Sequence, residues 1–317
     1  MNNVKNTKKI DVHAHVSPFP GMAPPLKSGE PMLTCEQQLW FYDNLNIEKG
    51  VLLPLVSSEF HYEPMTSLDC KYVADQNPDR FLWFCGIDPR SAGNSPTADL
   101  SKLIMHYKNL GAKGVGELTA QLYADDPLMD NLFYHCAECD MPVTIHLSAR
   151  FGNDYGIVDE IGLPRLEKML KKHKKLKIFG HSANFWSHIS GTISPLDWSG
   201  YPTGKVTEGT IARFLREYEN LYCDLSATSG SNALMRDPEY AAKFIEEFSD
   251  RLMFGCDICA TSQRFSFRFC EFLDKLYDDG MISADSYYKL VRGNAERLLD
   301  LKRSDTEFAY FTHKIND

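Results

Sequence analysis

Short apolar runs rich in β-branched and aromatic residues alternate along the chain with longer amphipathic stretches. Most of these runs are continuously apolar, which is typical of parallel strands that are buried on both faces. Eight runs predict strands: Ile10–Val12, Gly50–Val56, Phe81–Asp88, Gly114–Leu118, Pro142–His146, Leu176–His181, Leu221–Leu225 and Leu252–Asp257.

The amphipathic stretches between them predict helices, and several open with a proline or a polar capping residue. The clearest are Leu100–Leu110, Leu128–Cys139, Pro164–His173, Thr210–Glu219 and Pro238–Phe248. The long connection Val16–Gly50 begins as a Pro- and Gly-rich loop and becomes helical from Thr34 to Asn46. Eight strand-then-helix units predict a (β/α)₈ TIM barrel in the α/β class. We expect one domain over residues 1–317, with the barrel at about 10–300 and a tail at 303–317.

Composition and charge narrow the class of protein. The 317 residues include 34 Lys and Arg against 43 Asp and Glu, a net charge of −9, so the chain has no global electrostatic reason to bind nucleic acid or an anionic membrane. The basic run Lys171–Lys177 lies at the end of a predicted helix, where lysines complement the helix dipole. We therefore expect a small-molecule substrate, no nucleic acid and no membrane partner.

The cysteines and the N-terminal residues bear on the compartment. No apolar stretch follows the N-terminal lysines, no stretch approaches the length of a transmembrane helix, and nine cysteines are spread from Cys35 to Cys270. This pattern predicts a cytoplasmic protein. Two C-x-x-C matches, Cys136–Cys139 and Cys256–Cys259, fall at opposite ends of a barrel and cannot form one zinc site.

Side chains that can bind a metal stand at the C-terminal ends of five predicted strands, where TIM-barrel active sites form. They are His13, His15, Glu117, His146, His181 and Asp257. Any one histidine alone is more often a satisfied core or surface residue. Because one barrel mouth collects the whole set, a metal centre is the better interpretation.

The His13-x-His15 spacing has a physical reason. Residues i and i+2 of an extended segment point to the same side, so both imidazoles reach one ion. Zinc and similar divalent ions favour nitrogen ligands completed by a carboxylate.

These residues also carry a family resemblance. The segments IDVHAHV, PVTIHLSAR, IFGHSAN, LMFGCDIC and GNAERLL resemble the amidohydrolase superfamily, specifically its amidohydrolase-related branch, from Ile10 to Leu299. The resemblance implies a TIM barrel with a divalent metal, most often zinc, at the mouth, one or two ions, with manganese or others as alternatives. It implies that His13, His15 and His146 ligate metal, and that Asp257 is both a ligand and the group that accepts a proton from water. His181 would be a catalytic acid in single-metal members and a ligand in two-metal members.

Glu117 bears on the number of ions. It stands where two-metal members of the superfamily hold a bridging carboxylate or carboxylated lysine, so the resemblance makes a second ion plausible. The alternative is an ion pair of Glu117 with Lys113 or Arg150. Decarboxylating members generally lack a glutamate here, which favours hydrolysis.

The reaction follows from such a site. A metal can lower the pKa of water from 15.7 toward ~7 and polarise a carbonyl, which favours hydrolysis of a carboxylated lactone, an amide or an ester. The alternative is decarboxylation of an aromatic or enoic acid. A non-catalytic barrel is disfavoured by the intact ligand set, and the resemblance suggests a homo-oligomer.

Substrate-binding candidates lie in the loops that follow the strands. Arg150 could hold a substrate carboxylate, with pairing to Asp154 as the alternative, and His61 and Arg264 are further candidates. The segment Ser182–Lys205, which contains Trp186, resembles a lid over the mouth or a subunit contact.

Overall fold

The computed structural model describes residues 4–60, 65–152, 155–194, 198 and 200–301, so the predicted tail 303–317 lies outside the described residues. Its strands are β1 (Lys9–Ala14), β2 (Ile47–Leu52), β3 (Phe81–Trp83), β4 (Val115–Leu118), β5 (Val143–Ser148), β6 (Ile157–Val158), β7 (Ile178–His181), β8 (Leu221–Asp224) and β9 (Leu252–Met253). They form two parallel arcs, β1–β2–β3 and β4–β5–β7–β8–β9, while the short β6 pairs with β5.

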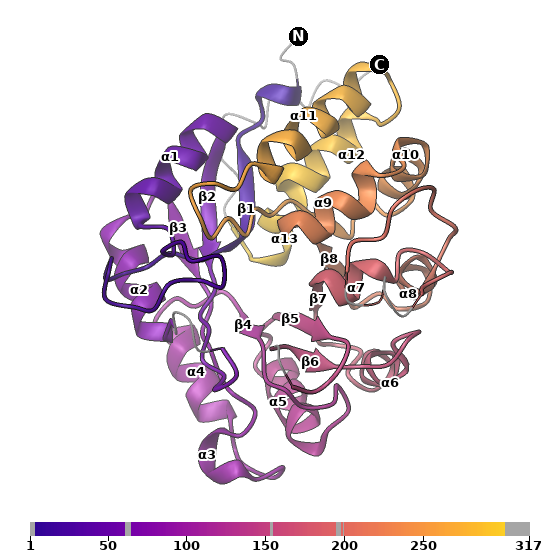
Figure 1. Ribbon diagram of the computed structural model, residues 1–317. Coiled ribbons are helices and arrows are strands. Elements are labelled where there is room, and N and C mark those ends of the chain that lie inside the picture. Colours follow the sequence, from indigo (N-terminus) through magenta and orange to yellow (C-terminus); the bar gives the residue numbers. More distant parts are fainter. Residues whose placement is uncertain (1–3, 61–64, 153–154, 195–197, 199, 302–317) are drawn as a thin grey trace, which may run out of the picture.

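The two arcs lie around one barrel (Figure 1), and backbone hydrogen bonds join them at both seams. At one seam, the Cys85 N–H donates to the Gly114 carbonyl at 2.9 Å. At the other seam, the Val12 N–H donates to the Phe254 carbonyl at 3.1 Å. The predicted TIM-barrel class is therefore confirmed, and closure brings the carboxyl ends of all its strands to one mouth.

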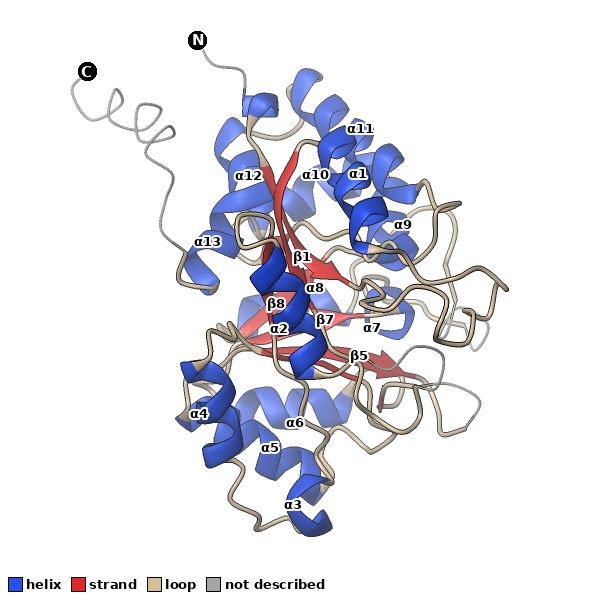
Figure 2. Ribbon diagram, turned by 90° about the vertical axis from the view of Figure 1, so that its left-hand side faces the viewer, coloured by secondary structure: helices blue, strands red, loops and turns tan. Residues whose placement is uncertain are grey.

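Helices surround the strands (Figure 2). The α-helices are α1 (Cys35–Leu45), α2 (Ser67–Gln76), α3 (Ser91–Asn94), α4 (Ser101–Asn109), α5 (Pro127–Glu138), α6 (Pro164–Lys172), α7 (Ala183–Ser187), α8 (Thr210–Glu217), α9 (Ala227–Met235), α10 (Pro238–Glu247), α11 (Phe265–Asp278), α12 (Ala284–Tyr288) and α13 (Asn294–Leu298). A 3₁₀ turn, η1 (Val4–Asn6), precedes β1, and a π-helical turn, η2 (Lys289–Gly293), links α12 to α13.

Local capping explains where several helices begin. Thr34 and Gln37 form a capping box at α1, and Thr66 and Asp69 form one at α2. Helices α5 and α10 begin with proline behind an aspartate cap. The predicted helices begin within a residue or two of α1, α4, α5, α6, α8 and α10, whereas α2 was not among the helices named from the sequence.

The apolar core has two layers. Inside the barrel, Val12, Val51, Phe84, Phe179 and Met253 pack in one cluster, and three residues of the C-terminal end join it: Ala295, Leu298 and Leu299. The larger cluster lies between the strands and the surrounding helices. Apolar side chains fill the barrel below its mouth, so the polar side chains collect at the mouth.

No helix in the described part of the chain combines the length and the apolar character that a membrane span requires.

Candidate metal centre

Two imidazoles at the end of β1 point at each other. His13 and His15 are 0% and 3% exposed, and their Nε2 atoms lie 3.0 Å apart. The Nδ1 of His15 is 2.9 Å from the Leu53 carbonyl, to which only an N–H can donate. Its Nε2 therefore carries a lone pair directed into the mouth.

Two carboxylates face this pair of nitrogens. Glu117 Oε2 lies 3.7 Å from Nε2 of His13 and 3.6 Å from Nε2 of His15. Asp257 Oδ1 lies 3.8 Å and 3.7 Å from the same two atoms. Four donor atoms from β1, β4 and the residues after β9 thus converge on one point.

The remaining oxygen of each carboxylate faces a second group of histidines. Glu117 Oε1 lies 2.6 Å from His146 Nδ1 and 3.8 Å from His181 Nε2. Asp257 Oδ2 lies 3.7 Å from His181 Nε2. Both carboxylates therefore lie between two sets of imidazoles, with one oxygen toward each set.

Backbone conformation places both carboxylates. Gly116 has φ +137°, and a Cβ there would lie 2.7 Å from the Thr144 carbonyl, so only glycine fits beside β5. Asp257 has φ +50°, and its N–H donates to the His13 carbonyl at 2.8 Å. Glu117 and Asp257 are thereby fixed to the strands that carry the histidines.

A third carboxylate, Asp224 at the end of β8, was not singled out from the sequence. Its Oδ2 is 2.6 Å from Nδ1 of His13 and 3.4 Å from Nδ1 of His181. The Ser226 N–H donates to Asp224 Oδ1 at 2.9 Å, and the Ser226 hydroxyl lies 3.0 Å from Nδ1 of His181. The available signal was the same as for the predicted ligands, a polar residue ending an apolar strand.

Below the histidines, the Asp11 carboxylate of β1 makes a hydrogen bond to the segment after β9 that carries Asp257. It accepts hydrogen bonds from the Cys256 N–H at 2.7 Å and the Tyr42 hydroxyl at 2.8 Å. Burial raises the pKa of Asp11 to about 7, although these hydrogen bonds favour the ionised carboxylate and lower the pKa.

The electric field of the site favours a cation. Burial opposes charge on His13, but the carboxylates of Asp257, Asp224 and Glu117 raise its pKa well above the usual value. Burial likewise opposes ionisation of Glu117, yet His146 and His13 hold its pKa well below the usual range. Three carboxylates, Asp257, Asp224 and Glu117, surround His13, a concentration of negative charge that a divalent ion would balance.

The donor set fits a divalent ion. Nitrogen and oxygen ligands about 2.0–2.2 Å from a tetrahedral zinc lie about 3.4 Å from one another. The five separations given above among His13, His15, Glu117 and Asp257 run from 3.0 to 3.8 Å. Glu117, His146 and His181 form another group whose candidate ligand atoms lie within 4.8 Å of one another. All six sequence-predicted ligands are therefore together at the mouth.

Glu117 is paired with histidines and not with the cations considered from the sequence. Among the described residues, its ion-pair partners are His13, His15, His146 and His181.

The described hydrogen bonds of two substrate-binding candidates, Arg150 and Arg264, do not involve this cluster. Arg150 is exposed, and its guanidinium makes no ion pair with a described residue. Arg264 donates to the Gln263 carbonyl at 2.8 Å and lies 5.6 Å above the Phe41 ring. His61 and Asp154 lie outside the described residues.

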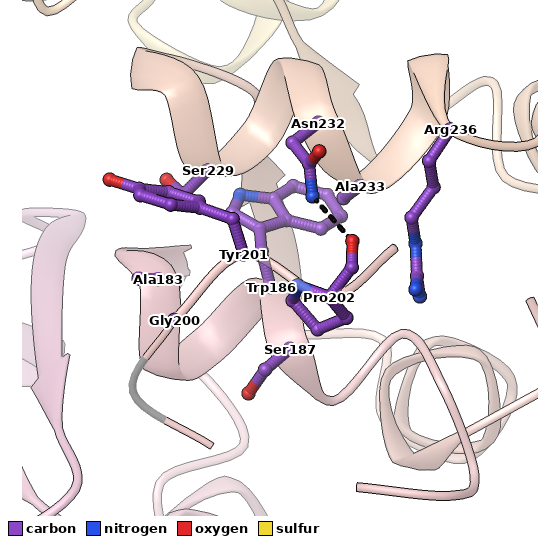
Figure 3. A pocket seen from close by; sticks show the side chains of 10 residues that line it. All are labelled: Ala183, Trp186, Ser187, Gly200, Tyr201, Pro202, Ser229, Asn232, Ala233 and Arg236. Atoms are coloured by element: carbon purple, nitrogen blue, oxygen red, sulfur yellow. Dashed lines mark hydrogen bonds between the residues drawn. The ribbon is translucent and has the colours of Figure 1, made fainter. Parts of the chain in front are cut away.

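Trp186 lines a shallow hollow between α7, α9 and the loop 200–202 (Figure 3). It is 2% exposed, and its indole N–H donates to the Asp224 carbonyl at 2.8 Å. Tyr201, which also lines the hollow, is 54% exposed. The part of the predicted lid that is described thus contains one buried indole and one exposed phenol.

One thiol of the second C-x-x-C match also touches the site. The Cys259 thiol lies 3.4 Å from Asp257 Oδ1, while its backbone N–H donates to Gln263 Oε1 at 2.7 Å. Cys256 and both cysteines of the first match are buried.

The chain is similar to known proteins in both sequence and fold. A family model described as amidohydrolase matches residues 10–301. A search of the curated proteins found no match.

Solved structures share the fold at low sequence identity. An uncharacterised TIM-barrel protein from Bordetella bronchiseptica aligns at TM-score 0.62 and 20% identity, covering 93% of this chain and 99% of the other. A probable 2-pyrone-4,6-dicarboxylic acid hydrolase from Acinetobacter baumannii aligns at TM-score 0.56 and 15% identity, covering 93% and 100%. A dihydroxybenzoic acid decarboxylase from Polaromonas, with bound manganese and the inhibitor 2-nitroresorcinol, aligns at TM-score 0.58 and 17% identity, covering 95% and 99%.

Proposed function

Because the chain belongs to the amidohydrolase family and is a metal-dependent enzyme of that superfamily, we propose that it hydrolyses a small carboxylated lactone, amide or ester. One observation carries the proposal. Glu117 and Asp257 each direct one oxygen toward the His13 and His15 nitrogens and the other toward His181. Two carboxylates shared between two sets of imidazoles suit a pair of ions and a hydrolytic reaction.

The residues divide between two ions. His13, His15, Glu117 and Asp257, whose facing atoms lie within 3.8 Å of one another across the two pairs, would hold the first, while Glu117, His146 and His181 would hold the second. When bound, such ions polarise a carbonyl and lower the pKa of water, which is the chemistry that hydrolysis at neutral pH requires.

Asp257 is the group that we assign to proton transfer. Its side chain is 18% exposed, whereas that of Glu117 is 3% exposed, so Asp257 is the carboxylate that water and a substrate reach. It accepts a proton from the attacking water and passes it to the leaving oxygen or nitrogen. Glu117, which is enclosed by histidines, would be shared by the two ions, with one oxygen toward each group of ligands.

Decarboxylation is the second candidate, and a separate contact favours it. Glu117 Oε1 lies 2.6 Å from His146 Nδ1, which is hydrogen-bonding distance, so this pair can be complete without a second ion. His181 would then be free to donate a proton to the substrate carbon as its bond to the departing carbon dioxide breaks. The alignment with a dihydroxybenzoic acid decarboxylase accords with this candidate.

Zinc is the ion that we propose, because two imidazole nitrogens lie in the first group of donors. Manganese is the alternative, since the Polaromonas structure holds it and carboxylates suit it. Binding of a substrate carboxylate by Arg150, and contacts of the substrate with His61, Trp186 and Arg264, stay predictions. A single catalytic domain, assembly as a homo-oligomer and a cytoplasmic location also remain predictions from the sequence.

Isotope labelling separates the two reactions. Purified enzyme is screened with carboxylated lactones, amides and hydroxybenzoic acids in water enriched in oxygen-18, with mass spectrometry of the products and infrared detection of carbon dioxide. Hydrolysis places one heavy oxygen in the product acid and releases no carbon dioxide. Stoichiometric release of carbon dioxide from a substrate that gains a proton on carbon would replace hydrolysis by decarboxylation.

A further inference from the structure

One buried carboxylate oxygen faces two imidazoles of the site from behind. Oδ2 of Asp224 lies 2.6 Å from Nδ1 of His13 and 3.4 Å from Nδ1 of His181. Asp224 is 0% exposed. Among the described residues, the groups of side chains able to hold an ion do not include Asp224, so its relation to the metal is through the histidines.

The position of Asp224 is itself fixed by three neighbouring contacts. The Ser226 N–H donates to its Oδ1 at 2.9 Å, and the Trp186 indole donates to its backbone carbonyl at 2.8 Å. The Ala227 N–H, which follows this turn, donates to the Cys256 carbonyl at 3.1 Å. The backbone of Asp224 is thus held by α7, and its carboxylate cannot rotate away from the histidines without breaking the hydrogen bond from the Ser226 N–H.

A carboxylate in this position selects the histidine tautomer. An ionised carboxylate only accepts hydrogen bonds, so an imidazole beside it places its proton on the facing nitrogen. Both oxygens of Asp224 face donors, since Oδ1 accepts from the Ser226 N–H at 2.9 Å and Oδ2 faces the Nδ1 atoms of His13 and His181. With the proton on Nδ1, the Nε2 lone pair of each ring faces the mouth.

Ser226 leaves two possibilities for His181. Its hydroxyl is 3.0 Å from Nδ1 of His181 and can either accept a proton from that atom or donate one to it. If Ser226 donates, His181 carries its proton on Nε2 and offers a proton donor to the site. If Ser226 accepts, Nε2 of His181 offers a lone pair.

We propose that Asp224 is a positioning residue that fixes both His13 and His181 as the Nδ1–H tautomer, which makes His181 a metal ligand and not a proton donor. This inference rests on the metal centre of the proposed function, and it specifies how His181 takes part in the second ion site. Oδ2 of Asp224 contacts one imidazole from each set, His13 and His181, so removing the charge of the carboxylate affects both sets. Ser226 then accepts from His181 and is dispensable for the tautomer.

The test replaces Asp224 by asparagine, whose amide can donate to Nδ1 and so invert the tautomer. Zinc affinity is measured by competition with a chromophoric chelator, and histidine tautomers by long-range ¹H–¹⁵N spectra of zinc-loaded protein labelled at its histidines. We expect Asp224→Asn to weaken zinc binding by roughly 10–100-fold, the usual effect of losing such a partner, and to give His181 an Nε2–H signal. Unchanged affinity and unchanged tautomers would overturn the proposal.

Two further variants keep the test decisive. Asp159→Asn is the matched control, since Asp159 is buried and accepts backbone hydrogen bonds at the start of α6, away from the site; we expect wild-type affinity. Ser226→Ala covers the case in which Asp224→Asn does not fold. We expect it to keep the His181 tautomer, and a switch to Nε2–H would assign the role to Ser226 and overturn the proposal. These readouts need no substrate, so failure to find hydrolysis would refute the proposed function and leave this result standing.

Discussion

The Nε2 atoms of His13 and His15 lie 3.0 Å apart, and both Nδ1 atoms already have partners, Asp224 for His13 and the Leu53 carbonyl for His15. Two nitrogen lone pairs at this distance repel each other unless a proton or a cation lies between them. The pair is thus stable only when positive charge is supplied, which links the fold of the mouth to its ion.

Metal removal is therefore expected to destabilise the protein. An ion present at 100 times its dissociation constant contributes about 2.7 kcal/mol, so dialysis against a chelator lowers the melting temperature by about 5 °C. Thermal unfolding followed by circular dichroism measures this shift. His15→Ala removes the chelator effect, whereas His173→Ala, a buried histidine paired with Asp130 outside the mouth, retains it. An equal chelator effect in both variants would contradict the account.

The glycine before Glu117 provides a second prediction. Gly116→Ala forces an L-residue to φ +137° and places its Cβ 2.7 Å from the Thr144 carbonyl, so we expect a loss of about 3 kcal/mol in urea unfolding together with metal loss. Gly152→Ala is the matched control. Its φ is +79°, no other atom lies within 4 Å of the added Cβ, and about 1 kcal/mol is expected with metal content unchanged. Similar losses in the two variants would mean that the close approach to β5 is unimportant.

His188 provides a pH dependence away from the metal. Its Nδ1–H donates to the Asn184 carbonyl at 2.7 Å, its Nε2 accepts from the Gly162 N–H at 3.1 Å, and burial lowers its pKa to about 4. As pH falls from about 6.5, the unfolded chain takes up a proton that the folded chain refuses. Stability then decreases until pH reaches about 4, by roughly 3 kcal/mol in total.

Urea unfolding at several pH values measures this dependence in the wild type and in His188→Gln. The variant is less stable at pH 7, since it loses one of the two hydrogen bonds, but its stability should change less between pH 6.5 and pH 4. Parallel pH profiles in the two proteins would exclude His188 as the source.

Trp186 could either contact the substrate or support the backbone of Asp224, and substitution separates these two roles. Trp186→Phe keeps a ring but removes the donor to the Asp224 carbonyl, so we expect the free energy of unfolding to fall by about 1–3 kcal/mol. The KM should stay near the wild-type value, because the indole is buried. Trp40→Phe, at an exposed position, should change neither quantity. A raised KM with unchanged stability would instead favour a contact between Trp186 and substrate.

Much of the barrel was predictable because its strands are apolar and its helices carry strong start signals. The eight predicted strands all occur, but their ends differ. The last prediction extended to Asp257, whereas β9 ends at Met253 because the chain leaves the sheet before Asp257 adopts its positive φ. A two-residue strand such as β6 has too little pattern to detect.

Helix α9 and Asp224 show what the pattern could not reveal. The sequence of α9, ATSGSNALM, is rich in small polar residues and contains Gly230, so it lacks an apolar stripe. The Asp224 carboxylate was detectable as a polar end to β8, but its use by His13, which is 211 residues away, depends on the three-dimensional closure of the barrel. The ligand set followed from strand ends, while the residues behind it required the structure.

Metal content per chain, measured by plasma mass spectrometry on protein purified without chelator, tests most directly whether Glu117 joins two ions. We expect about two equivalents in the wild type and about one in Glu117→Ala, because that carboxylate faces both sets of histidines. Glu160→Ala, which removes an exposed carboxylate paired with Arg165, should leave the content at two. One equivalent in the wild type, unaffected by Glu117→Ala, would contradict the bridged centre.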